Sequence, residues 1–242
     1  GASVARGTPF LGEYDCTRGR VLFIEADMPR KMLQQRVLQA EETKSLCFLH
    51  SEPFDVVKLM TKGLLPDDFK RARDLAPILV IVDSLRKTHS QDEIDSSAPS
   101  RVYEAWKRLF PGACIAVIHH DRKLSTNPDA IQRPEEAARG SGAWLDDIDT
   151  GIHMSKLRGH KHGGHVATVS LSKCRYAEDL APIVVKMDDD SLLLQPTEPT
   201  PRAALAKFRV TNPQATAQEM VQYLIDAKLC SRATAYRLVA PQ

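Results

Sequence analysis

The sequence predicts an α/β protein with a parallel sheet, an antiparallel hairpin at the C-terminal edge of that core, and a small helical module at the end of the chain. Two continuous apolar runs, "APILVIV" at 76–82 and "ACIAVI" at 113–118, favour strands that are buried on both faces. A helical pattern separates them, and alternating strands and helices are typical of parallel sheets. Two helical patterns joined by a brief turn at 229–231 predict a helix-turn-helix.

Length and composition are those of a globular protein with one large core and a small appended module. The chain has 242 residues and a formal charge of +2, which is too small to indicate nucleic-acid binding without a local basic patch. Its five cysteines are odd in number and never spaced as CxxC, so they indicate neither a disulfide framework nor a zinc site. This usage predicts a cytoplasmic location, and no apolar run is long enough to predict membrane contact.

The elements of the core follow from local patterns. Helices are expected where apolar residues recur at helical spacing, and strands where they run together. In chain order we expect the end of a helix at 2–6, a strand at 20–24, a helix at 29–42, a strand at 53–60, a helix at 66–75, the first apolar strand, a helix at 101–110, and the second apolar strand.

The second half of the chain contains a long polar segment, 121–143, of a length that is usually functional or mobile. Segments 150–159 and 165–175 then predict an antiparallel hairpin, and 181–196 a final pair of edge strands. The proline- and threonine-rich stretch "QPTEPTPR" is typical of a linker. We therefore predict a core over 1–195, a linker over 196–206 and a helix-turn-helix-like module over 207–242.

Acids and histidines follow the expected parallel strands at the point where each strand ends. Glu25 and Asp27 follow the first strand, Asp83 and Ser84 the next, and His119 and His120 the last. Because open α/β sheets bind ligands at the carboxyl ends of their strands, these side chains are expected to form one site. Carboxylates there could hold a divalent cation or orient a water molecule, and an imidazole could sense a nearby anion.

These residues, in this order, resemble the RecA-fold ATPases, and most closely the hexameric replicative helicases of the RepA and DnaB type. "PILVIVDSL" is similar to their Walker B strand, and "LFIEADMP" to the strand whose terminal acid polarises the attacking water, with Asp27 where the family usually has Glu. "AVIHHDRK" resembles the sensor strand, "RGSGAWLDDID" the family's Arg-x-Ser-Gly-Ala segment, and "SKCR" its Lys-x-Arg pair. The resemblance covers about residues 2–195.

The resemblance implies an ATP- and Mg²⁺-dependent DNA helicase or translocase that works as a homo-hexamer. Asp83 would hold Mg²⁺, directly or through water, and Asp27 would orient the lytic water. Lys173 and Arg175 would reach the nucleotide of a neighbouring subunit. The catalytic residues implied are Asp27, Glu25, Asp83, His120, Lys173 and Arg175, and the nucleotide-binding residues are Asp83, Ser84 and Arg139.

The sequence departs from the family in one respect, because no G-x-x-x-x-G-K-[ST] motif occurs in it. In the family this phosphate-binding loop precedes the helix that "ASVARG" resembles, so we expect it upstream of Ala2. Its amides and lysine supply most of the phosphate contacts, and these 242 residues alone are therefore expected to be inactive. Either the chain is a trimmed form, or it is a natural fragment or pseudo-ATPase.

Two groups of basic residues are candidates for DNA binding. Arg122, Lys123 and Arg133 could follow a single strand through the channel of a ring, or the loop that holds them could be merely solvated. Arg232 and Arg237, in a helix capped by Ser231, could contact duplex DNA, or that helix could serve packing or protein docking. The second class of function that the sequence allows is thus a non-catalytic DNA-binding or adaptor protein with a RecA-like shell.

Two further clusters could bind a metal ion: first the histidines of the "GHKHGGH" turn, and second a histidine with the acids that follow it within 89–95. Imidazoles at short spacing can chelate, but a hairpin turn places alternate side chains on opposite faces, so a solvated turn is the alternative at the first cluster. At the second, the alternatives are a solvated loop or an interface contact. The clusters are His160 with His162 and His165, and His89 with Asp92, Glu93 and Asp95.

Overall fold

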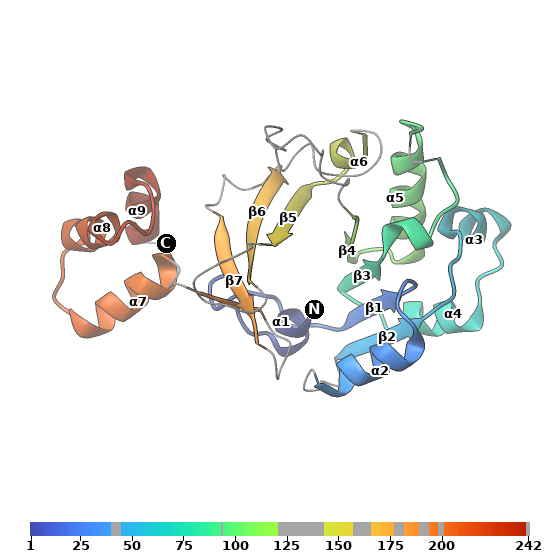
Figure 1. Ribbon diagram of the computed structural model, residues 1–242, viewed down its shortest axis with the longest axis horizontal. Coiled ribbons are helices and arrows are strands. Elements are labelled where there is room, and N and C mark those ends of the chain that lie inside the picture. The colour runs from blue at the N-terminus through green and yellow to red at the C-terminus, as the bar shows by residue number, and fades with distance from the viewer. Residues whose placement is uncertain are drawn as a thin grey trace.

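The computed structural model describes residues 1–39, 45–92, 94–120, 143–156, 166–176, 182–188, 194–197 and 201–240. Figure 1 shows a helix-flanked parallel sheet at one end of the view, an antiparallel sheet in the middle, and helices α7 to α9 at the other end. The predicted α/β class with a RecA-like parallel core is confirmed.

The parallel sheet has the strand order β2-β1-β3-β4, and its first three strands are in register over their whole length. All neighbours are parallel, so the carboxyl ends of the strands lie at one edge. The order of strands along the chain requires helical crossovers between them, as the alternating pattern predicted. The strands are β1 (Val21–Glu25), β2 (Leu46–His50), β3 (Leu79–Asp83) and β4 (Cys114–Val117).

The main core lies on one face of this sheet. Leu22 and Ile24 of β1 and Val80 and Val82 of β3 alternate inward and are at most 2% exposed. They meet Trp106 and other apolar side chains of the helices that follow β2 and β3. The helices of this half are α1 (Ala2–Arg6), α2 (Arg30–Gln39), α3 (Val56–Lys62), α4 (Asp67–Asp74) and α5 (Ala98–Leu109), with a 3-10 turn η1 (Leu85–Lys87) after β3.

Burial on both faces, expected for the two apolar strands, holds only in part. Alternate residues of β3 are buried and half-buried, and Cys114 and Ala116 of β4 are exposed. β4 stands at the end of the strand order, and within the described chain its paired neighbour is β3.

Two local predictions differ from the structure. Residues 53–60 were expected to form a strand, but α3 begins at Val56 because Asp55 caps it, accepting a hydrogen bond from the Lys58 amide at 3.0 Å. The strand at the outer side of β1 is instead β2. Its sequence "LCFLH" is half-buried at every position and does not alternate between apolar and polar residues. Local capping therefore outweighs the β-branched pair Val56 and Val57.

The predicted antiparallel hairpin is confirmed, and so is the final pair of strands. These strands form a separate four-stranded sheet in the order β5-β6-β7-β8, in which each strand pairs with its neighbour in the sequence. The short helix α6 (Ala143–Asp146) precedes this sheet, whose strands are β5 (Thr150–Lys156), β6 (Val166–Cys174), β7 (Ile183–Met187) and β8 (Leu194–Pro196).

The C-terminal helices are α7 (Pro201–Thr211), α8 (Ala217–Asp226) and α9 (Arg232–Val239). They share a small apolar cluster in which Leu205 of α7 meets Leu224 and Ala235. Residues 201–206, which the sequence assigned to a linker, are helical. Pro201 suits the first turn of a helix, and the alanine- and leucine-rich sequence after it has a high helix propensity.

Candidate active site

The candidate site lies at the edge of the parallel sheet where β1, β3 and β4 end. Glu25 and Asp83 are directly paired in the register of β1 and β3. The chain leaving β4 stays beside this pair, because the Leu85 amide donates to the Ile118 carbonyl at 2.9 Å. The sheet thus brings together the acids and the histidines that the sequence placed at three separate strand ends.

Glu25 supports the turn after β1. Its side chain is 1% exposed, and its Oε1 atom accepts hydrogen bonds from the Asp27 amide at 2.8 Å and the Met28 amide at 2.7 Å. A buried carboxylate needs such donors to offset the loss of water. Both oxygen-to-amide contacts hold the chain in the bend that presents Asp27, so Glu25 positions that residue.

Asp27 stands at the surface between two basic side chains. Its Oδ1 atom lies 3.8 Å from Nζ of Lys87, and its Oδ2 atom lies 3.7 Å from Nε2 of His120. The Asp27 side chain is still 38% exposed. A carboxylate held from both sides and open to solvent can accept a hydrogen bond from a water molecule.

Asp83 is half-buried at the tip of β3, and its peptide bond to Ser84 is cis. Burial raises the pKa of Asp83, and the nearby carboxylates of Glu25 and Asp27 raise it further, against the opposing charges of His120 and Arg36. Surplus negative charge at a partly buried site is reduced when a divalent cation binds. The donor set therefore fits Mg²⁺ held by Asp83 with water completing its coordination, the arrangement that Mg²⁺ commonly adopts.

Ser84 and His119 lie behind this surface. Ser84 is 1% exposed, so its side chain belongs to the interior. His119 lies against Trp144 of α6, with ring centroids 5.7 Å apart. The adjacent His120 side chain is 63% exposed and is the one that faces Asp27.

Lys173 and Arg175 lie at the end of β6, next to α6. Lys173 Nζ donates to the carbonyls of Leu145 and Asp146, each at 2.7 Å, and Arg175 donates to the Asp146 carbonyl at 2.7 Å. Cationic side chains commonly satisfy the last carbonyls of a helix in this way. The Arg175 side chain is 49% exposed, so the pair is held by its own subunit and still accessible from outside.

The described chain covers only part of the predicted metal clusters and basic residues. Asp92 and Asp95 are in the described chain, where Asp95 pairs with Arg101 at 2.6 Å and with Ser97, contacts that lower the pKa of Asp95 to about 2. Among the described residues no group of three or more His, Cys, Asp or Glu side chains is arranged to hold a metal ion. Outside the described residues lie Glu93, Arg122, Lys123, Arg133, Arg139, His160, His162 and His165.

Sequence reasoning missed two residues of this region. Lys87 faces Asp27, and its only signal in the sequence is its place four residues after Asp83. Trp144 is 1% exposed and stacks on His89 at 5.1 Å, which anchors α6 to the core beside His119. Its signal is an aromatic residue in a polar stretch that resembles a functional segment.

Comparison with known protein families bears on this site directly. A family model described as an AAA domain matches residues 1–126, slightly more than half of the chain. The chain belongs to this family. The matched region of the AAA domain contains β1 to β4 and all of Asp27, Asp83 and His120.

Membership identifies an ATPase-type, nucleotide-binding domain, for which nucleotide and Mg²⁺ are the implied ligands. No curated protein matches the chain.

In the described part of the AAA domain protein, none of the helices has the length and apolar character needed to span a bilayer.

Proposed function

We propose that this chain is the motor part of an ATP-dependent DNA helicase or translocase that works as a ring of identical subunits. The resemblance to the hexameric replicative helicases implies six subunits in the ring. The observation that carries the proposal is the meeting of Asp27 and His120, 3.7 Å apart, beside the tip of the strand that ends in Asp83. A water-orienting acid, a cation-holding acid and a phosphate-sensing imidazole are groups that phosphoryl transfer requires. The AAA domain supports the nucleotide part of the proposal.

Each side chain has a role that its surroundings allow. Asp27 accepts a hydrogen bond from the attacking water, while Lys87 and His120 limit its rotation. Asp83 would hold the cation, and the charge of that cation would help to neutralise the phosphates. His120 has the exposure needed to respond to the terminal phosphate, and Glu25 holds the turn that positions Asp27.

The ring is proposed because Lys173 and Arg175 are half-exposed and lie on a different sheet from Asp27. A cation supplied by a neighbouring subunit can stabilise the charge that develops on a transferred phosphoryl group. In the isolated subunit, the carbonyls at the end of α6 hold the two side chains. In the ring, these side chains would exchange those carbonyls for the neighbour's nucleotide.

The decisive experiment measures ATP hydrolysis by the complete gene product, with and without single-stranded DNA and Mg²⁺. We expect Mg²⁺-dependent hydrolysis that DNA stimulates and that Asp83→Asn abolishes. The matched control is Asp74→Asn, at the exposed end of α4. A complete gene product that binds ATP and assembles, but hydrolyses no nucleotide, would contradict the proposal.

A DNA-binding adaptor is the second candidate, and the C-terminal helices favour it. Helices α8 and α9 follow one another after a short connection, as a helix-turn-helix would, with Ser231 capping α9 and a complete capping box at Thr216 and Glu219. Arg232 and Arg237 are exposed on α9, and the Arg232 guanidinium lies 5.9 Å from the centre of the Tyr236 ring. Such a surface suits phosphates or base edges of duplex DNA.

A further inference from the structure

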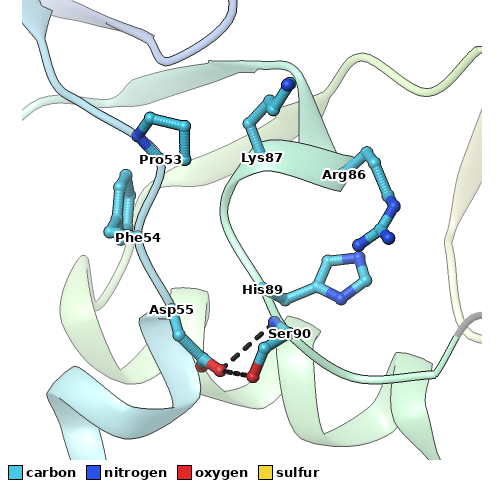
Figure 2. A pocket seen from close by; sticks show the side chains of 7 residues that line it. All are labelled: Pro53, Phe54, Asp55, Arg86, Lys87, His89 and Ser90. Atoms are coloured by element: carbon cyan, nitrogen blue, oxygen red, sulfur yellow. Dashed lines mark hydrogen bonds between the residues drawn. The ribbon is translucent and has the colours of Figure 1, made fainter.

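A pocket of about 650 Å³ lies beside the turn that follows Asp83, and no role proposed above uses it. It is formed where the chain leaving β2 passes the chain leaving β3 (Figure 2). The residues that line the pocket are Pro53, Phe54, Asp55, Arg86, Lys87, His89 and Ser90.

The walls of the pocket are fixed by backbone contacts. The Phe54 amide donates to the Lys87 carbonyl at 3.0 Å, and the Val56 amide donates to the Thr88 carbonyl at 2.9 Å. The Phe54 ring meets Phe69 edge to face at 5.0 Å, inside the main core. The two crossing segments therefore form a preformed hollow, as ligand sites usually are.

Among the described residues that line the pocket, the one acid, Asp55, is engaged by its own surroundings. Asp55 accepts hydrogen bonds from the Lys58 amide and from the amide and hydroxyl of Ser90, and its side chain is 9% exposed. Burial opposes its ionisation, but the hydrogen bonds from Ser90 and Lys58 prevail and lower its pKa. This carboxylate therefore serves the start of α3 and the contact with Ser90. Arg86 and Lys87 are exposed basic residues of the pocket lining.

Apolar and cationic side chains occupy opposite walls. Figure 2 shows Pro53 and Phe54 on one side, Arg86 and His89 on the other, and Lys87 between them. A ring-and-phosphate ligand matches this division, because bases stack on flat apolar surfaces and phosphates bind guanidinium and ammonium groups. We propose that this pocket binds one nucleotide unit, with its base near Pro53 and Phe54 and its phosphate near Arg86 and Lys87.

Lys87 connects the pocket to the candidate active site. Its ammonium group lies 3.8 Å from Asp27, and the residue is a member of the pocket lining. A phosphate in the pocket attracts this ammonium away from Asp27, which frees that carboxylate to accept a hydrogen bond from water. This regulatory step rests on the proposed function, whereas nucleotide binding in the pocket does not.

The test uses the two tryptophans of the chain, labelled as 5-fluorotryptophan and observed by ¹⁹F NMR. Trp144 stacks on His89 and also lies against His119, so its resonance, assigned with Trp144→Phe, reports on the pocket and on the end of β4. Arg86→Ala tells the two apart, because Arg86 lines only the pocket among these two sites. Adenosine monophosphate and a thymidine oligonucleotide are titrated separately with EDTA present. We expect at least one to shift this resonance, with a Kd about tenfold or more higher in Arg86→Ala. Arg73→Ala, at an exposed position of α4, should leave the Kd unchanged.

The two probes distinguish the source of the nucleotide unit. A shift with the monophosphate indicates a free nucleotide, and a shift with the oligonucleotide alone indicates a DNA strand. No shift with either probe, or an unchanged Kd in Arg86→Ala, would overturn the proposal. The titration requires neither hydrolysis nor a metal ion, so a failure of the pocket and a failure of the proposed hydrolysis are separate results.

Discussion

The imidazole of His120 contacts the carboxylate of Asp27 across the end of β3, with Nε2 and Oδ2 3.7 Å apart. The two residues follow β1 and β4, which are not neighbours, because β3 lies between them. The contact therefore passes beside Asp83, whose pKa responds to both side chains. A change at His120 consequently reaches the residue proposed to orient water without any intervening group.

The first prediction concerns this contact. Asp27→Asn should lower kcat for ATP hydrolysis by roughly 10²- to 10⁴-fold, the range expected for loss of a general base, and leave nucleotide affinity unchanged. Asp27→Glu should retain activity, because the longer acid can still reach a water molecule. His120→Ala should lower hydrolysis and remove its stimulation by DNA, because the side chain that limits the rotation of Asp27 is lost. If Asp27→Asn hydrolyses ATP at the normal rate, another group orients the water.

The second prediction concerns stability and pH. Because the folded-state pKa of Asp83 is raised, its ionisation opposes folding as the pH rises from its usual value of 3.8 through the higher folded value. The cost is complete above that range, so Asp83→Asn should raise the Tm at pH 7 and lose this gain at pH 3. Thermal unfolding at both pH values tests this, with the exposed Asp74→Asn as control. An equal or lower Tm for Asp83→Asn at pH 7 would be inconsistent with the environment described.

The third prediction separates action within a subunit from action between subunits. Arg175→Ala should lower kcat by about 10³- to 10⁵-fold, as loss of an arginine finger does, without weakening nucleotide binding. Mixing Arg175→Ala subunits with Asp27→Asn subunits should restore part of the activity, because some interfaces then combine an intact Arg175 with an intact Asp27. No recovery in mixed rings that assemble normally would mean that Arg175 acts within its own subunit.

The fourth prediction concerns Asp55, which caps α3 and binds Ser90. Asp55→Ala should destabilise the chain by about 1 to 2 kcal/mol, measured by urea unfolding, because both the cap and the Ser90 contact are lost. Asp55→Asn keeps an acceptor and should cost less. Since the folded-state pKa is lowered, the contribution of the charge is present above the usual value of 3.8 and is lost as the pH falls through the folded value. Asp55→Asn should therefore approach the wild type in acid.

The fifth prediction concerns α9. Arg232→Ala should weaken binding of duplex DNA and reduce the salt dependence of the affinity by about one phosphate contact. Lys207→Ala, at an exposed position of α7, serves as the control and should have a smaller effect. Equal affinities and salt slopes for the wild type and Arg232→Ala would favour protein docking for these helices.

Much of the parallel sheet could be predicted because its signals are local. Continuous apolar runs marked β3 and β4, and acids followed by Pro29 marked the end of β1. The strand β2 was missed because its apolar run, 46–49, is short, and a short run does not distinguish a strand from a buried helix segment. The strand predicted at 53–60 does not form, because the Asp55 side chain accepts a hydrogen bond from the Lys58 amide and starts a helix there. Strand propensities do not include such a side-chain contact.

The sequence by itself determined which residue types stand at the strand ends, since parallel strands must bring their carboxyl ends to one edge whatever the details of packing. Only the tertiary structure decided how these residues divide the work. Glu25 faces inward onto two amides, Asp27 faces outward between Lys87 and His120, and the pocket beside them arises where two segments cross. Such roles depend on burial and on partners distant in the chain, and neither is encoded in the spacing of residues along it.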